Sequence, residues 1–322
     1  MSMQAMAAAS YGPLQRLKAI SIPRPEPRAG EVRVRVQASA LNPADYKVIL
    51  GKMKFLHGRK FPLVVGYDFS GTIDALGPSV SNFAVGDDVF GFLPYGPGNN
   101  RGAFAEALIA KVGELARKPA GVSHIVAAAA ATPGLTAILG LRDLGRLPPS
   151  GGRVLITGAS GGVGSLAIGI ARKLGASVTA VGSGRGLELA KRLGAESVID
   201  RKANDFMRAA KGPFDVVFDA AAASRWGQWK SLLKPGGRFV TTLPTFAFAI
   251  DKVASLFSST GIRLVMVKSR SSDLDLLGKW LTSGLEVPLD ATVPVLNVAE
   301  ALARLERGGV VGRIAVDVAG GF

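Results

Sequence analysis

The sequence contains no cysteine, and this absence excludes several kinds of protein at once. Without a thiol, the chain can form no disulfide framework, no Cys-ligated zinc or iron–sulfur centre and no cysteine nucleophile. Histidine is nearly as scarce, since the chain has only His57 and His124, which do not form the HExxH pattern of a zinc peptidase. We therefore expect a protein that binds no metal.

The sequence also has few charged residues and no long hydrophobic run. Charged residues make up 20% of the chain, too few for a disordered protein. The most apolar run, 125–139, is broken by Pro133-Gly134 and falls short of the roughly 20 residues of a membrane span. Residues 1–11 lack the cationic and apolar parts of a secretory signal. We expect a cytoplasmic protein of about two domains, with no transmembrane segment.

Acidic residues are scarce relative to basic ones. The chain has 24 Asp and Glu against 39 Lys and Arg, which gives a formal net charge of +15. A basic protein can bind nucleic acid, an anionic membrane or an anionic small molecule, and composition alone leaves all three open. If the partner is an anionic membrane, the residues in contact with it would be Lys52, Lys54, Arg59 and Lys60 together with Phe55 and Phe61.

Two patterns divide the chain. Residues 31–38 alternate as EVRVRVQA, which predicts a half-buried strand, and 63–76, 87–93 and 104–110 add β-like pieces, so about the first 120 residues are mainly β. Strands then alternate with helices, which predicts an α/β fold with a doubly wound parallel sheet. The six candidate strands are 153–157, 177–182, 197–200, 214–220, 236–243 and 262–268. The final strand, helix and strand of 290–318 are expected to return to the first domain.

A glycine-rich loop follows the first strand of this alternation. In RVLITGASGGVG (153–164), Gly158, Gly161 and Gly164 stand between a strand and a helix, as in dinucleotide-binding loops. Such a loop brings the backbone close to a pyrophosphate at the helix N-terminus. The alternative is a glycine-rich turn without a ligand. The predicted contacts in this loop are Gly158, Ser160, Gly161, Gly162, Val163 and Gly164.

The end of the second strand indicates which nicotinamide cofactor is bound. An NAD site places Asp or Glu there, whereas VGSGRG (181–186) has no acid. Ser183 and Arg185 are instead suited to a 2′-phosphate, and Arg201 and Lys202 follow the third strand. The pattern predicts NADPH as cofactor, with a solvated loop position as the alternative for Arg185.

The chain resembles the zinc-free quinone oxidoreductase (ζ-crystallin-like) branch of the medium-chain dehydrogenase/reductase superfamily. The resemblance rests on 40–51, 65–73, 85–92, 102–110, 127–141, 158–164, 232–240 and 308–316. It implies a GroES-like catalytic domain formed by 1–125 and 286–322, with a Rossmann NADPH-binding domain at 126–285. It also implies a substrate cleft between the two domains and a homodimer that pairs through strand 262–268.

The resemblance also implies roles for individual residues. Asn42-Pro43 has the pattern of a helix N-cap followed by Pro at the first helical position. By the resemblance this segment lies beside the nicotinamide, where Asn42 orients cofactor or substrate and Tyr46 or Lys47 binds the substrate carbonyl. A surface lysine is the alternative for Lys47. The other implied cofactor contacts are Thr136, the backbone of 242–245 including Leu243, Val267 and Lys268. Arg201 stands where relatives often carry Tyr.

Together these features predict an NADPH-dependent oxidoreductase. Its substrate would be a small apolar quinone or the C=C bond of an α,β-unsaturated carbonyl, reduced without zinc. The alternative is a cofactor-regulated nucleic-acid-binding protein of the ζ-crystallin type, because residues 126–285 carry 21 basic and only 10 acidic residues. A dinucleotide needs few of those charges, although nucleic acid is not the partner we favour.

Overall fold

The computed structural model describes residues 1–57, 60–96, 102–242 and 246–322, which form two compact units. Unit 1 comprises Met1–Thr132, Lys268–Ser283 and Leu289–Phe322, and unit 2 comprises Pro133–Val267 and Gly284–Pro288. This division differs from the predicted domains at 126–132, 286–288 and 268–283, the last of which contains helix α9 (Ser271–Thr282). Helix α9 packs against strands of unit 1, and Gly278 allows the close approach because a Cβ there would lie 3.0 Å from Pro119 Cγ.

Unit 1 is mainly β. Its strands are β1 (Ser2–Ala8), β2 (Leu17–Pro23), β3 (Glu31–Ala40), β4 (Leu63–Val64), β5 (Asp68–Leu76), β6 (Asp88–Phe92), β7 (Ala107–Lys111), β8 (Leu115–Arg117), β15 (Leu289–Pro294) and β16 (Arg313–Asp317). They form a small sheet in the order β2-β1-β4 and a larger one in the order β15-β16-β3-β5-β6-β8, with β7 also paired to β3. The helices besides α9 are η1 (Leu14–Arg16), α1 (Pro43–Ile49), α2 (Lys54–His57), η2 (Val112–Glu114), η6 (Val295–Asn297) and α10 (Val298–Arg307).

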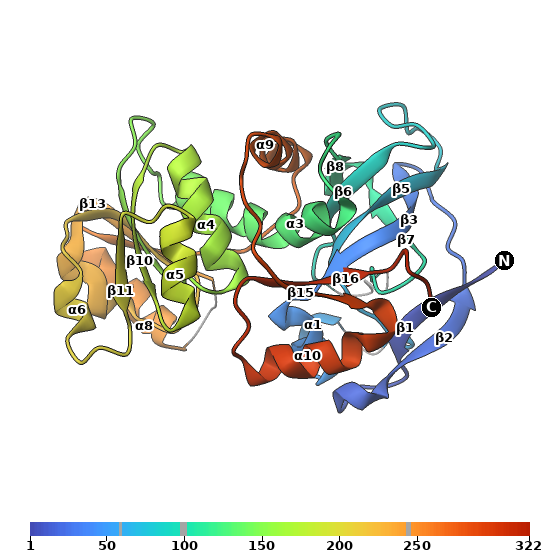
Figure 1. Ribbon diagram of the computed structural model, residues 1–322, viewed down its shortest axis with the longest axis horizontal. Coiled ribbons are helices and arrows are strands. Elements are labelled where there is room, and N and C mark those ends of the chain that lie inside the picture. Colours follow the sequence, from blue (N-terminus) through green and yellow to red (C-terminus); the bar gives the residue numbers. More distant parts are fainter. Residues whose placement is uncertain (58–59, 97–101, 243–245) are drawn as a thin grey trace. The chain divides into compact units, whose positions relative to one another are not determined.

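The predicted alternation in β3 is confirmed. Val32, Val34 and Val36 are buried, whereas Arg35 on the opposite face is exposed. The C-terminal strand β16 pairs antiparallel with β3, with Ala315 opposite Ala40. Figure 1 shows this pairing as a red strand beside a blue one. The C-terminal segment therefore returns to the first domain, as its strand–helix–strand pattern predicts.

Unit 2 contains the predicted doubly wound sheet. Its strands are β9 (Arg153–Thr157), β10 (Ser177–Gly182), β11 (Ser197–Asp200), β12 (Phe214–Asp219), β13 (Leu233–Thr241) and β14 (Gly261–Leu264). All pairings are parallel, and the order β11-β10-β9-β12-β13-β14 is that of a dinucleotide-binding Rossmann sheet. The helices are α4 (Gly162–Lys173), α5 (Arg185–Arg192), α6 (Phe206–Ala209), α7 (Trp226–Trp229), η4 (Lys230–Leu232), α8 (Phe246–Ala254) and η5 (Ser255–Phe257).

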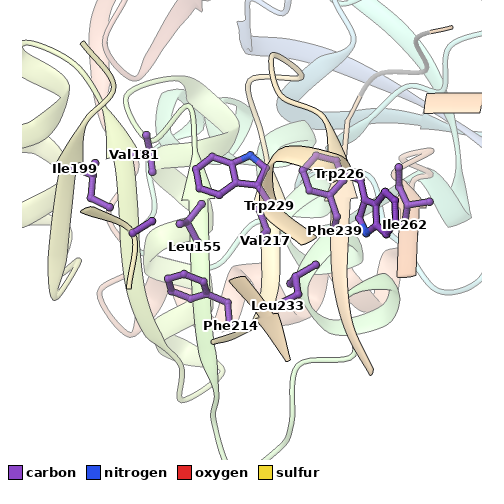
Figure 2. Close-up of a cluster of buried hydrophobic side chains, with 11 residues drawn as sticks. Leu155, Val181, Ile199, Phe214, Val217, Trp226, Trp229, Leu233, Phe239 and Ile262 are labelled. Atoms are coloured by element: carbon purple, nitrogen blue, oxygen red, sulfur yellow. The ribbon is translucent and has the colours of Figure 1, made fainter. Parts of the chain in front are cut away.

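A cluster of large, buried apolar side chains packs on one face of this sheet (Figure 2). Residues of successive parallel strands, among them Leu155, Val217 and Phe239, meet Trp226 and Trp229 from α7. Alternate residues of a strand point to opposite faces, so these side chains all lie on one side of the sheet. The cluster fixes the strand order and hence the loops at the carboxyl ends of the strands.

Several sequence-based boundaries differ from the structure. Strand β14 ends at Leu264 rather than at 268, so Val267 and Lys268 lie beyond it. The run at 125–139 is not interrupted by Pro133-Gly134, because α3 (His124–Ile138) passes through both residues and continues as a π-helical turn, η3 (Leu139–Leu144).

By length and composition alone, the helical stretch His124–Leu144 could cross a membrane. Its most apolar window has a mean hydropathy of 1.6, and 78% of that window is buried inside the protein. Among the described residues it is the single helix that meets these criteria, and one mostly buried helix is weak evidence for a membrane span.

Candidate functional site

The glycine loop of unit 2 has the geometry of a phosphate-binding turn. Gly158 adopts a φ of +68°, a left-handed conformation that glycine adopts without strain. A Cβ on Gly164 would lie 2.1 Å from the carbonyl oxygen of Gly158, so only glycine allows α4 to start this close to β9. Ser160 packs in turn against Gly186 of α5, where a Cβ would lie 2.2 Å from Ser160 Cβ.

The N-terminus of α4 is suited to an anion. Gly161 is the N-cap, and the first turn that follows it contains no acidic residue. The first N–H groups of any helix lack a partner within the helix and carry the positive end of its dipole. A Cβ on Gly161 would meet only Gly158 O, at 3.5 Å, which leaves space beside these donors. The predicted contacts Gly161, Gly162, Val163 and Gly164 therefore lie at a helix N-terminus of the kind that can bind a pyrophosphate.

The residues predicted to bind the 2′-phosphate follow two neighbouring strands. Ser183 follows β10 and is half-buried, and Arg185 is the exposed first residue of α5. Arg201 is also exposed, and its backbone N–H donates to Gly182 O at 2.8 Å. This bond joins the ends of β10 and β11, so Ser183, Arg185, Arg201 and Lys202 gather at one corner of the sheet.

Asp219 lies at the carboxyl end of β12, the strand beside β9, and was not predicted as a site residue. Its buried carboxylate accepts hydrogen bonds from Thr157 Oγ1 at 2.5 Å and from the Ser224 N–H at 3.0 Å. These bonds join the carboxyl ends of β9 and β12 and fix the loop that follows β12. The available signal was an acidic residue at the end of an apolar strand.

Unit 1 contains a buried polar network around Asn42. The side-chain nitrogen of Asn42 donates to Asp68 Oδ2 at 3.0 Å, and its oxygen accepts from Arg313 Nη1 at 2.9 Å. Arg313 Nη2 also lies 2.5 Å from Asp68 Oδ2, and the Thr132 N–H donates to Asp68 Oδ1 at 2.7 Å. Burial raises the pKa of Asp68, while the Arg313 charge and the Thr132 and Asn42 donors oppose the rise.

Asp45 caps the helix that carries the predicted catalytic residues. Asn42 is the N-cap of α1 and Pro43 its first residue, as predicted. The Asp45 carboxyl accepts the Asn42 N–H at 2.6 Å and the Gly66 N–H at 3.1 Å. Complete burial raises the pKa of Asp45 to about 7, and the two backbone donors oppose the rise only in part.

Tyr46 and Lys47 follow on α1, and both are half-buried. Burial raises the pKa of Tyr46, and the negative charge of Glu306 on α10 adds to the effect. Helices α1 and α10 lie side by side within unit 1 (Figure 1). Tyr46 therefore keeps its phenolic proton at neutral pH and can act as a hydrogen-bond donor.

The remaining predicted contacts lie in α3 and in the segment after β14. Thr136 is buried in α3, Val267 is half-buried beyond the end of β14, and Lys268 is exposed. The chain passes from unit 2 to unit 1 between Val267 and Lys268. Leu243 lies outside the described residues.

Sequence reasoning also missed Asp68 and Arg313. Both stand in segments used for the family resemblance, 65–73 and 308–316, but neither was given a role. Their available signal was charge within otherwise apolar strands, since Asp68 is fully buried and Arg313 is 5% exposed. Among the described residues, no group of three or more His, Asp or Glu side chains could hold a metal ion.

Comparisons with known proteins agree with this architecture. Residues 28–120 match the alcohol dehydrogenase GroES-like domain, and residues 193–316 match the domain described as zinc-binding dehydrogenase. The chain is 29% identical to the chloroplast envelope quinone oxidoreductase homolog of Arabidopsis thaliana, over 98% of both chains. It is 32% identical to the 2-methylene-furan-3-one reductase of Solanum lycopersicum, over 98% of this chain and 79% of the relative. The structure of the quinone oxidoreductase from Coxiella burnetii matches with a TM-score of 0.87 and 30% identity, covering 99% of this chain and 100% of the other.

Fold, glycine loop and comparisons together define an oxidoreductase of the nicotinamide-dependent dehydrogenase class, with a GroES-like domain and a Rossmann domain. The chain belongs to the zinc-free quinone oxidoreductase branch of the medium-chain dehydrogenase/reductase superfamily.

Proposed function

We propose that this protein is an NADPH-dependent reductase of quinones or of α,β-unsaturated carbonyl compounds. The observation that carries the proposal is the corner of the sheet where Ser183, Arg185, Arg201 and Lys202 gather with no acid at the end of β10. A carboxylate there would bind a ribose 2′-hydroxyl, whereas guanidinium groups are suited to a 2′-phosphate. Two relatives, a quinone oxidoreductase homolog and a 2-methylene-furan-3-one reductase, support the two substrate classes.

The chain's own residues would bind the cofactor, orient the cofactor or substrate and polarise the substrate carbonyl. The Gly158–Gly164 loop and the N-terminus of α4 would hold the pyrophosphate of NADPH, and Thr136, Leu243, Val267 and Lys268 would contact the rest of the dinucleotide. When bound, NADPH supplies the hydride. Lys47 Nζ or the Tyr46 phenol would donate a hydrogen bond to the substrate carbonyl oxygen as negative charge develops there. Asn42 would orient cofactor or substrate from its fixed position in the network.

The test is NADPH oxidation by the purified protein with a panel of quinones, alkenals and cyclic enones. We expect turnover with at least one member of the panel. Lys47→Ala should lower kcat with that substrate by about tenfold or more, because hydrogen-bond donors to a developing charge contribute on that scale. Lys54→Ala, at the exposed start of α2, is the matched control and should leave kcat unchanged. Failure to bind NADPH, together with no turnover of any member, refutes the proposal.

We also propose that two copies pair through β14. This strand is at the end of the described sheet, and the Val265 N–H donates to Thr241 O of β13 at 2.8 Å. Because backbone groups alternate in direction along a strand, those of Ile262 and Leu264 face away from β13. Lys252 Nζ and Arg263 Nη1 now donate to Ile262 O, at 3.3 and 2.9 Å, and pairing would replace them with backbone N–H groups.

Light scattering tests this pairing. We expect twice the 33.3 kDa mass of one chain. Leu264→Pro removes an outward N–H and should yield monomers, whereas Leu264→Ala keeps the N–H and should remain dimeric. A monomeric wild type, or a proline variant that stays dimeric, contradicts the proposal.

A further inference from the structure

Pro133 leaves a gap in the hydrogen bonding of helix α3. A proline inside a helix has no N–H for the carbonyl four residues earlier, and its ring pushes that carbonyl aside. The carbonyl concerned is that of Ala129, a fully buried residue. A buried carbonyl without a donor destabilises a fold, so another donor is expected.

The donor is the side chain of Arg313 on β16. Its Nε–H donates to Ala129 O at 3.1 Å, across a separation of 184 residues in the sequence. Its other two nitrogens bind Asn42 and Asp68, as described above. One planar guanidinium therefore joins three acceptors, on α1, β5 and α3. Asp68 completes the connection, because its other oxygen accepts the Thr132 N–H, adjacent to the proline.

We propose that Arg313 is a positioning residue with two linked effects. Its Nε–H replaces the helix donor that Pro133 lacks, and its terminal nitrogens hold the Asn42 side chain at the start of α1 in one orientation. The first effect concerns the fold alone. The second rests on the proposed function, because it assumes that Asn42 orients cofactor or substrate.

The Arg313→Lys variant tests whether the planar geometry of the guanidinium matters beyond its positive charge. A lysine keeps the positive charge beside Asp68 but cannot reach three acceptors with a planar fork. We expect the apparent Tm to fall by about 5 °C. We expect kcat for NADPH-dependent reduction to fall by about tenfold, because small displacements of an orienting group are costly to turnover. Arg33→Lys is the control: it weakens a half-buried pair with Asp74 elsewhere in unit 1 and should leave kcat unchanged.

Pro133→Ala tests the replacement of the missing donor directly. Alanine restores a backbone N–H at position 133, which can bind Ala129 O when Arg313 is absent. Pro133→Ala should therefore raise the Tm more in the Arg313→Lys protein than in the wild type, and recover about half of the loss. Equal effects in the two backgrounds would show that Arg313 does not replace the helix donor.

The same double variant tests the link to Asn42. The backbone N–H restored at position 133 can bind Ala129 O but cannot contact Asn42. Stability should therefore recover while kcat stays low. In an Asn42→Ala protein, Arg313→Lys should change kcat little, because the Asn42 side chain that Arg313 would orient is already absent. If kcat recovers with stability, or if the Asn42 and Arg313 effects add, the positioning role is wrong. A wild type without NADPH turnover refutes the proposed function instead and leaves the stability measurements to decide the helix role.

Discussion

Arg313 and Asp68, two charged residues in apolar strands, form a buried ion pair in unit 1, and Asn42 binds both of them. The Asn42-Pro43 pattern predicted the start of α1 because an N-cap and its helix are adjacent in sequence. Asp68 and Arg313 are 245 residues apart, and nothing in either segment indicates that the two side chains form a buried pair. The pairing of β16 with β3, and of β3 with β5, brings the two strands together and shows why a charge in each is tolerated.

Asp45 provides a prediction at this scale. Its pKa of about 7 in the folded chain lies above the value of about 3.9 expected when unfolded. Between these values the folded chain holds a proton that the unfolded chain has released. The contribution of this carboxyl to stability is therefore complete below about pH 4 and is lost as pH rises to about 7.

Asp45→Asn removes this titration. The free energy of urea unfolding should fall between pH 5 and pH 7.5 more steeply in the wild type than in the variant. A difference between the two proteins that stays constant with pH would contradict the assignment, as would one of opposite sign.

At the scale of elements, the glycine loop was the most predictable part of the molecule. Strand, glycine turn and helix follow one another within 153–173, so their geometry is set by local sequence. The end of β14 and the place of α9 were not predictable in the same way. Each is decided by what the element packs against, and α9 packs on β6 and β8 of unit 1, far from it in sequence.

Two glycines of the loop should respond differently to alanine. In Gly164→Ala the added Cβ meets the Gly158 carbonyl at 2.1 Å, and we expect a loss of about 1–3 kcal/mol in unfolding free energy. In Gly161→Ala the Cβ has space, so stability should change little while NADPH binding weakens. Denaturant unfolding and fluorescence titration with NADPH measure the two effects. A Gly164→Ala protein as stable as wild type contradicts the close helix–strand contact.

At the scale of the whole molecule, composition and order along the chain predicted a good deal. The absence of cysteine excludes Cys-ligated zinc and so favours a zinc-free relative, and the change along the chain from a β pattern to an α/β pattern predicted a sheet of each kind. The net charge of +15 is only partly accounted for. Arg185, Arg201 and Lys202 have a place at the proposed phosphate corner, and binding of nucleic acid by the other basic residues stays a prediction.

We propose that Arg185, at the corner beside β10, recognises the 2′-phosphate of NADPH. The most direct measurement is kcat/KM for NADPH and for NADH, with one quinone, in the wild type and in Arg185→Ala. We expect the wild type to favour NADPH and the variant to lose that preference by roughly 10- to 100-fold, the scale of a charge-assisted hydrogen bond. Arg192→Ala, at the other end of α5, should keep the preference. A wild type that favours NADH, or an Arg185→Ala protein with an unchanged ratio, would contradict the account.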